Sequence, residues 1–395
     1  MSGPGYRRLL GRRFFLWVLV ATAGKVPIAM ASIGMVFLVR ELPGGYTLGA
    51  SLAATYVLGE VVGAPVLGLW LTPETMRRHL ALGMLVGAAA FGGLVLARSA
   101  SPALLLVCAF FAGAGPAASP GGLRTLLTSA VPDRDAAPAL SVEAALTQAI
   151  WAAAPGLVVL MALRVGPGAP LLVAAGCAVA AAVLLLRMPP GTPREQDDRP
   201  AAPVLRSLAA AWPIYVTSAA SMALLASAEL ALPALLEYRQ LAVGWAGPLL
   251  MTFSIVTAAG SLCYGLRTWP GSPARQTLTM LVVTSVAVLS VAVLPGLPGI
   301  WLGLLCAGLL QAGTMVARNL WLRERLPGRM HTAGYSIGYA VQGAGYSVTA
   351  TAVGLVLGAS TPPAAVLCCV AIALLLIAAS AVASSRANSG VRVEA

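Results

Sequence analysis

Two residues of opposite charge, Lys25 and Glu60, each lie inside a long apolar stretch of this sequence. A charge in the middle of a membrane costs about 2.5–3.5 kcal/mol on insertion scales, so such residues call for a functional hypothesis. A buried carboxyl can take up a proton and release it again, and a neighbouring ammonium group would tune the pKa of that carboxyl. The alternative, to which we give equal weight, is a permanent ion pair that holds one helix against the next.

The two charges lie at matching depths. Lys25 lies about 10 residues from the predicted cytoplasmic end of its stretch. Glu60 lies about 11 residues from the predicted cytoplasmic end of the next stretch. At 1.5 Å per residue these depths agree to within about one helical turn. A short connection makes the two helices antiparallel neighbours, so we expect Lys25 and Glu60 to lie within hydrogen-bonding distance, directly or through water.

Four other ionisable residues fall within or at the ends of apolar stretches. Glu229, two residues after Ser227, is a second candidate for binding a proton or a substrate, and the alternative is a carboxylate hydrated from the outer side. Arg124, Glu143 and Arg318 lie near helix ends on the inner side. We expect these three to form an inner gate or a structural ion pair, or to reach the membrane interface as ordinary helix-end charges.

Uncharged polar side chains within the apolar stretches are candidates to line a cavity for a small molecule. Each alone is weak evidence, because Tyr and Trp are common at membrane interfaces that hold no site. The candidates are Gln148, Trp151, Tyr215, Gln311, Tyr339, Gln342 and Tyr346.

The elements that must position these residues are predicted to be membrane-spanning helices. The chain is 59% hydrophobic and only 10% charged, and its mean hydropathy is +0.87. Soluble domains carry roughly 25% charged residues, which this chain does not approach. A spanning helix needs about 20 mostly apolar residues. Stretches of this kind occupy residues 14–39, 47–71, 79–97, 103–127, 139–163, 168–186, 209–236, 243–266, 277–295, 299–322, 333–357 and 363–384.

The basic residues between these stretches are unevenly distributed. With the N-terminus placed inside, 18 of the 25 Lys and Arg residues fall in inner segments, four fall in outer segments, and the others lie within the stretches. This positive-inside pattern predicts a multi-pass protein of the plasma membrane with both termini in the cytoplasm. It also argues against nucleic acid as a partner, because the charges lie between apolar runs and form no stripe.

The chain divides at its middle, and the two halves echo each other. Residues 187–208, rich in proline and charge, are interpreted as a flexible cytoplasmic linker. We expect one six-helix bundle over residues 1–186 and a second over 209–395. Four pairs of matched residues, each 194 or 195 positions apart, support the repeat: Arg124 and Arg318, Pro132 and Pro327, Ser141 and Ser336, and Gln148 and Gln342.

The segment GLWLTPETMRR, residues 68–78, resembles the G-x-L-x-D-x-x-G-x-R-R loop of the major facilitator superfamily. Gly68, Arg77 and Arg78 match that pattern. The family's Leu, Asp and second Gly are replaced by Trp70, Thr72 and Thr75. The resemblance implies an all-α membrane protein with 12 transmembrane helices in two pseudo-repeated bundles. In the family the Asp helps to latch the halves in the outward-open state, so its replacement puts that latch in question here.

The resemblance implies a secondary transporter that works by alternating access. The sequence has no G-x-x-x-x-G-K-[ST] loop for a nucleotide. Because the predicted interior carries few charges, our first expectation is proton-coupled efflux, by antiport, of an amphiphilic drug or metabolite. The alternatives are proton-coupled uptake of a small solute and a membrane sensor that does not transport.

No enzymatic activity is expected, because no convergent catalytic set is present. His79 and His331 lie near inner loops, and the six cysteines lack the spacing of a metal site, so we expect neither metal nor cofactor. The expected partners are a small-molecule substrate, protons and the lipid bilayer, with the chain acting as a monomer.

Overall fold

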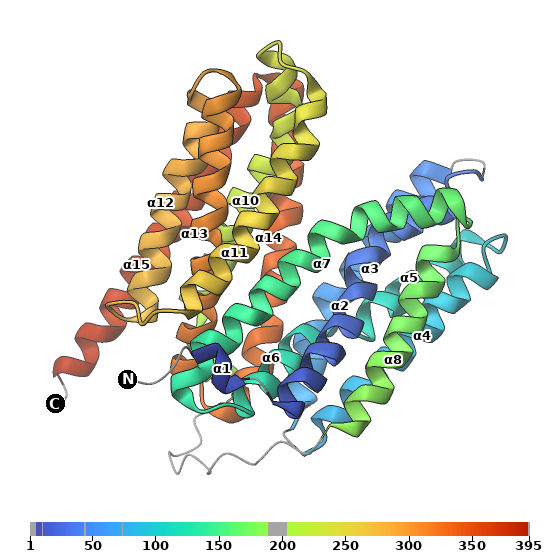
Figure 1. Ribbon diagram of the computed structural model, residues 1–395, viewed down its shortest axis with the longest axis horizontal. Coiled ribbons are helices and arrows are strands. Elements are labelled where there is room, and N and C mark those ends of the chain that lie inside the picture. Colours follow the sequence, from blue (N-terminus) through green and yellow to red (C-terminus); the bar gives the residue numbers. More distant parts are fainter. Residues whose placement is uncertain (1–4, 10, 43–44, 73, 189–203, 394–395) are drawn as a thin grey trace. The chain divides into compact units, whose positions relative to one another are not determined.

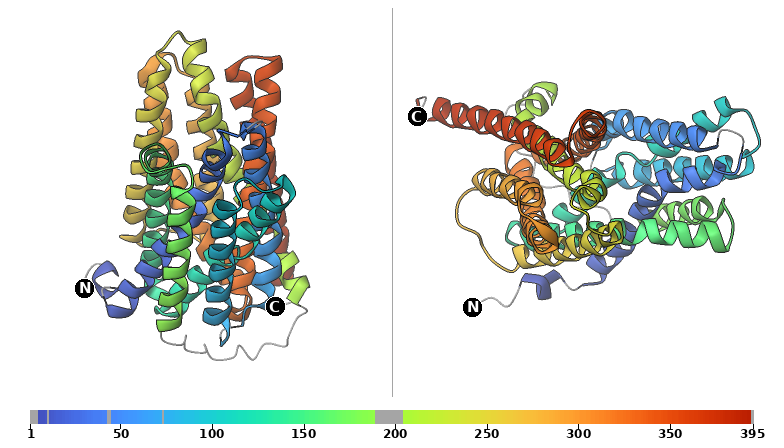
Figure 2. Two further views of the ribbon diagram at one scale, coloured as in Figure 1. Left: turned by 90° about the vertical axis from the view of Figure 1, so that its right-hand side faces the viewer. Right: turned by 90° about the horizontal axis from the view of Figure 1, so that it is seen from above.

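The computed structural model describes residues 5–9, 11–42, 45–72, 74–188 and 204–393, and every regular element in that part of the chain is a helix (Figure 1). The first half contains α1 (Gly5–Leu9), α2 (Arg12–Val39), α3 (Gly45–Trp70), α4 (Met76–Leu96), α5 (Pro102–Ala114), α6 (Ser119–Ser129), η1 (Asp133–Asp135), α7 (Ala136–Arg164) and α8 (Ala169–Arg187). The second half contains α9 (Val204–Ala210), α10 (Trp212–Tyr238), η2 (Val243–Trp245), α11 (Ala246–Gly265), α12 (Pro273–Val293), α13 (Gly296–Arg325), η3 (Gly328–Met330), α14 (His331–Ala359) and α15 (Pro362–Val393). Figure 2 shows α15 as one continuous helix running to the C-terminal end.

Twelve helical segments of the described chain are long and apolar enough to cross a membrane, and each overlaps one of the predicted stretches. The prediction is therefore confirmed in the number of spans and in their places. One span is broken: the stretch expected over 103–127 consists of α5 and α6 with residues 115–118 between them. Pro116 lies in this break, and its ring removes the N–H that would otherwise donate a helical hydrogen bond.

The predicted linker, residues 187–208, falls largely outside the described residues. Its described part contains the end of α8 and most of α9, a seven-residue helix that the sequence did not indicate.

The helices group into two compact units that follow the sequence halves with one exchange. Unit 1 contains residues 1–139, 149–199 and 327–340, and unit 2 contains 140–148, 200–326 and 341–395. Each unit thus takes in a short piece from the other half, namely the start of the eleventh span in unit 1 and part of the fifth span in unit 2. The two pieces correspond under the 194-residue repeat, and they hold Ser336 and Ser141, which are both fully buried.

The same five helix pairs pack together in each unit, which is what a structural repeat requires. In unit 1 the pairs are α2 with α3, α2 with α8, α3 with α5, α4 with α5 and α4 with α8. The corresponding pairs in unit 2 are α10 with α11, α10 with α15, α11 with α13, α12 with α13 and α12 with α15. Each unit has its own apolar core, built around Met35, Phe91 and Leu171 in unit 1 and around Leu232, Leu281 and Ile300 in unit 2.

Glycines bring α3 and α5 into backbone contact. A Cβ atom at Gly59 would overlap the carbonyl oxygen of Phe110, and a Cβ atom at Gly113 would overlap the carbonyl oxygen of Tyr56. Small residues at membrane-helix interfaces permit this close approach, because lipid offers no hydrophobic force between helices and tight packing must hold them. The glycine contacts therefore fix the stretch of α3 that carries Tyr56 and Glu60.

Replacing Gly59 with Ala would push a methyl group against the Phe110 carbonyl, which is backbone and cannot swing aside. We expect Gly59→Ala to lower the unfolding midpoint in detergent, with a loss of about 1–3 kcal/mol typical of overpacking. Gly92→Ala in α4 is the matched control, because a Cβ atom there meets nothing within 4 Å and Ala favours a helix over Gly. Size-exclusion profiles after heating compare the two variants, and equal stability would contradict the close packing of α3 on α5.

Candidate functional site

The carboxyl of Glu60 receives hydrogen bonds from two phenols inside unit 1. Tyr56 Oη and Tyr339 Oη each lie 3.2 Å from Glu60 Oε1. Tyr56 precedes Glu60 by one turn of α3, whereas Tyr339 comes from the first part of α14. Two helices that are far apart in the sequence therefore meet at one carboxylate oxygen.

The local structure explains why the phenols reach this carboxyl. Residues four apart on a helix face the same side, so α3 by itself brings Tyr56 next to Glu60. Tyr56 is only 1% exposed, and its ring packs against Phe91 of α4 with 6.3 Å between the ring centroids. The sequence analysis selected Glu60 and Tyr339 but overlooked Tyr56, although the four-residue spacing was a signal that could have revealed it.

Lys25 lies on α2 and is only 6% exposed. The pairing of Lys25 with Glu60 stays a prediction, and so does the choice between a proton-coupling role and a structural role.

Small residues line the interface at which the first part of α14 packs against α3 and α6, and we call this interface the small-residue seam. Its members recur every four positions: Ala64 and Gly68 on α3, Ala117 just before α6, Gly121 and Thr125 on α6, and Thr332, Ser336 and Ala340 on α14.

The contacts along this small-residue seam are close. A Cβ atom on Gly68 or Gly121 would collide with the side chain of Ser336. Thr332 Oγ1 lies 3.1 Å from Thr125 Oγ1 in a hydrogen bond. Tyr339 adjoins the end of the seam, so the contact of α14 with Glu60 is made beside a tightly packed interface.

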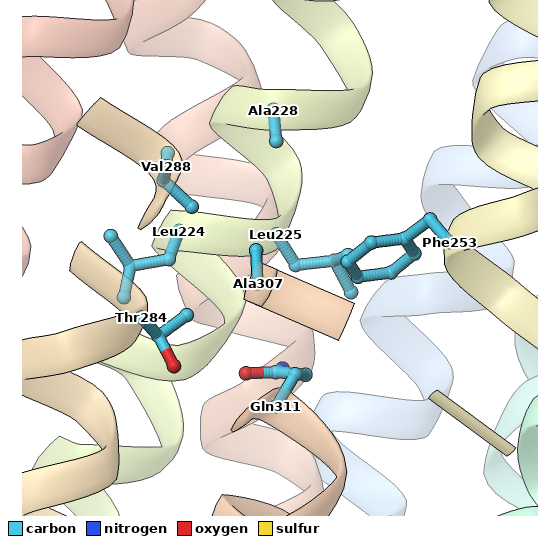
Figure 3. A pocket seen from close by; sticks show the side chains of 8 residues that line it. All are labelled: Leu224, Leu225, Ala228, Phe253, Thr284, Val288, Ala307 and Gln311. Carbon is cyan, nitrogen blue, oxygen red and sulfur yellow. The ribbon is translucent and has the colours of Figure 1, made fainter. Parts of the chain in front are cut away.

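Unit 2 contains a pocket between α10, α11, α12 and α13, and Figure 3 shows its lining. Gln311 of α13 lies at this pocket and is only 2% exposed. Its Oε1 accepts a hydrogen bond of 3.1 Å from Ser221 Oγ, and its Nε2 has no partner among the described residues. A buried polar atom without a partner costs about 1–3 kcal/mol, so this amide needs an explanation.

The structure places the other cavity candidates in different surroundings. Tyr215 is buried on α10, Trp151 is 48% exposed on α7, and Gln148 lies one turn before it. Gln342 and Tyr346 follow Tyr339 on α14, and both are partly buried. A role for any of these residues in binding a substrate stays a prediction.

Glu229 lies on α10, four residues after Leu225 of the unit 2 pocket, and it is partly buried. It does not line the pocket itself. Its proposed part in binding a proton or a substrate also stays a prediction.

A sequence model of one family of membrane transporters matches residues 14–350, most of the chain, and its description is Major Facilitator Superfamily. The chain belongs to the Major Facilitator Superfamily. It is a multi-pass membrane protein with a transporter fold, and its family and structural relatives identify it as a transporter and not an enzyme.

Solved structures of superfamily transporters have the same fold. The human organic anion transporter MFSD10 (TETRAN) gives a TM-score of 0.73 at 15% identity, over 95% of this chain and 99% of that one. The E. coli fucose:proton symporter FucP gives 0.69 at 14% identity, over 93% and 98%. A bacterial homologue of the iron transporter ferroportin, in an outward-facing state, gives 0.68 at 15% identity, over 94% and 98%. A comparison with curated proteins found no match.

The superfamily's loop between the second and third spans takes a distinct form in this member. Thr72 and Thr75, which replace the family's Asp and second Gly, hydrogen-bond through their hydroxyls at 2.9 Å. A guanidinium N–H of Arg77 donates to the carbonyl oxygen of Met188, just past the end of α8. A cation at this place satisfies a free helix-end carbonyl and complements the helix dipole. Arg78 is exposed, so the two matching arginines differ in their surroundings.

Of the three residues predicted to form an inner gate, two are buried and Arg124 is partly buried. Glu143 is 1% exposed and Arg318 is 3% exposed, and both belong to unit 2. Arg124 belongs to unit 1, where its guanidinium carbon lies 5.3 Å from the ring centroid of Tyr335 on α14. This is a cation–π contact beside the small-residue seam. A gate formed by the three together stays a prediction.

The contact between Arg77 and Met188 can be tested by comparing Arg77 with Arg78, its neighbour in the motif. We expect Arg77→Met to lower the unfolding midpoint, because it removes a charged donor worth about 1.5–3 kcal/mol from the end of α8. Arg78→Met is the control, and an exposed substitution of this kind changes stability by less than about 0.5 kcal/mol. Thermal unfolding in detergent measures both variants, and equal effects would count against the capping role of Arg77.

Proposed function

We propose that this transporter couples the movement of an amphiphilic small molecule to the movement of protons, with Glu60 as the proton-binding residue. The proposal rests on the hydrogen bonds that Tyr56 and Tyr339 donate to Glu60 Oε1. Phenols are neutral hydrogen-bond donors, and two of them meet at one oxygen of this carboxyl. Ionising a carboxyl away from water is costly, and binding a proton removes that cost.

The two phenols also provide a route from proton binding to helix movement. Hydrogen bonds to an ionised carboxylate are roughly twice as strong as bonds between neutral groups. The bond between Tyr339 of α14 and Glu60 of α3 is thus stronger when Glu60 is ionised and weaker when it is protonated. By linkage, a conformation that keeps this bond favours the ionised carboxyl, and one that breaks it favours the protonated carboxyl. A proton gradient could then drive alternating access through this contact.

The amphiphilic character of the substrate is proposed from the polarity of the interior. The unit 2 pocket is lined by apolar residues with Thr284 and Gln311, and no charged side chain contributes to it. Of the superfamily structures compared, one is named a proton symporter, one an organic anion transporter and one a homologue of an iron transporter. At 14–15% identity these likenesses concern the fold alone, and a fold does not select a substrate.

We further propose that the transporter lies in the plasma membrane with both termini in the cytoplasm, that it acts as a monomer, and that it exports its substrate by proton antiport. The uneven distribution of basic residues supports this orientation. Proton-coupled uptake remains the second candidate, because the same cycle can run in reverse.

The proposed coupling predicts how protons respond to a substrate in everted membrane vesicles. Cationic, neutral and anionic amphiphiles are added to energised vesicles, and proton release is followed with a pH-sensitive dye. At least one compound should release protons from vesicles that contain the wild type, and Glu60→Gln should abolish this release. Tyr339→Phe should lower it by at least about tenfold, because a bond to a charged group is worth about 1.5–3 kcal/mol. Glu74→Gln, at an exposed glutamate between α3 and α4, is the control and should behave like the wild type.

Other outcomes separate the alternatives. An equal response from the wild type and Glu60→Gln would remove Glu60 from the coupling step. Proton movement that accompanies a compound in the same direction would favour symport and uptake. Saturable binding of a compound without any movement of that compound or of protons would favour a sensor.

A further inference from the structure

The pocket in unit 2 has a polar end and an apolar end. It is lined by Leu224, Leu225 and Ala228 of α10, Phe253 of α11, Thr284 and Val288 of α12, and Ala307 and Gln311 of α13. In Figure 3 the side chains of Thr284 and Gln311 lie together at the lower end, and aliphatic and aromatic side chains enclose the rest. The space open to the centre of a water molecule is about 10 Å³, which is close to the minimum for a single water.

The Gln311 amide supplies a hydrogen-bonding group that the protein leaves unused. The side chain is 2% exposed, its Oε1 is held by Ser221 Oγ, and its Nε2 has no partner in the described part of the chain. Turning the amide over would exchange its two polar atoms, and one of them would still lack a partner. Buried amide groups are almost always satisfied in native proteins, so a ligand atom is expected at this position.

The second polar group limits which ligand atom fits. The hydroxyl of Thr284 donates to the carbonyl oxygen of Met280 at 2.7 Å, so it can only accept a further hydrogen bond. An atom that accepts from Gln311 Nε2 and donates to Thr284 Oγ1 is a hydroxyl-type oxygen. A charged ligand is excluded, because no charged side chain lines the pocket to offset the loss of its hydration.

We propose that this pocket binds one neutral hydroxyl oxygen, which accepts a hydrogen bond from Gln311 and donates one to Thr284. A resident water molecule supplies this chemistry, because the open space of about 10 Å³ is close to the minimum for a single water and leaves no room for a larger group. The proposal does not depend on the proposed function.

Radiolytic hydroxyl-radical footprinting of the purified full chain tests for the water. Radicals formed from a bound water oxidise the side chains beside it, so Phe253 and Leu224 should be labelled although they are only 5% and 1% exposed. Phe91, which is fully buried in unit 1 away from this pocket, gives the background rate. Labelling of Phe253 should fall to that background in Gln311→Met and in Thr284→Val.

Two further variants control for side effects of these changes. Thr257→Val removes another buried hydroxyl that bonds within its own helix, to the Phe253 carbonyl at 2.8 Å, and it should leave the labelling unchanged. Gln311→Met leaves Ser221 without its partner, so the double variant Ser221→Ala/Gln311→Met is measured as well. If water fills the pocket, the double variant loses the labelling and its unfolding midpoint falls by about 2 °C or more. In a dry pocket the same variant removes an unsatisfied donor, and its midpoint rises or stays constant.

The proposal is overturned if Phe253 is labelled no faster than Phe91 in the wild type, or if its labelling is unchanged in both Gln311→Met and Thr284→Val.

Discussion

A carboxyl taken out of water must find hydrogen-bond donors or a proton, and this constraint governs the best-defined ionisable site of the protein. Glu60 meets it with the phenols of Tyr56 and Tyr339, both 3.2 Å from the same carboxylate oxygen. One phenol is supplied by the helix that carries Glu60, so it is available in any conformation that keeps α3 intact. The other comes from α14 and depends on tertiary packing. The charge on Glu60 and the position of α14 are therefore linked energetically.

Small residues make that tertiary contact possible. Gly68 and Gly121 leave room for Ser336, so the first part of α14 lies directly on α3 and α6 and brings Tyr339 to Glu60. Glycine contacts of the same kind hold α3 against α5. In lipid, helices associate through close packing because burial of apolar surface gives them no advantage over contact with lipid tails. Tight backbone packing at the glycines thus positions the polar contact between Tyr339 and Glu60.

The two units share a scaffold, but their polar sites differ. The same five helix pairs pack in each, and the exchanged segments correspond under the repeat. The residue 195 positions after Glu60 is Ile255, which has no ionisable group. Unit 2 instead buries the amide of Gln311 beside an apolar pocket. The two units therefore share their helix packing but differ in their buried polar groups, as expected when function resides in individual sites on a common fold.

The sequence by itself determined the number and places of the spans, because crossing about 30 Å of hydrocarbon requires a continuous apolar stretch that any reader of the chain can recognise. It also revealed the repeat and the superfamily, and it selected Glu60, Tyr339 and Gln311 as polar residues in apolar surroundings. Only the tertiary structure decided which of these residues meet. It joined Glu60 to Tyr339 across 279 positions of the chain, gave Arg77 a carbonyl at the end of α8, and set Gln311 beside Ser221. The side chains of a lipid-embedded helix are apolar on almost every side. The sequence pattern therefore does not indicate which face of the helix meets which neighbouring helix. That choice depends on the fit of small and large side chains between helices, which exists only once the helices have packed.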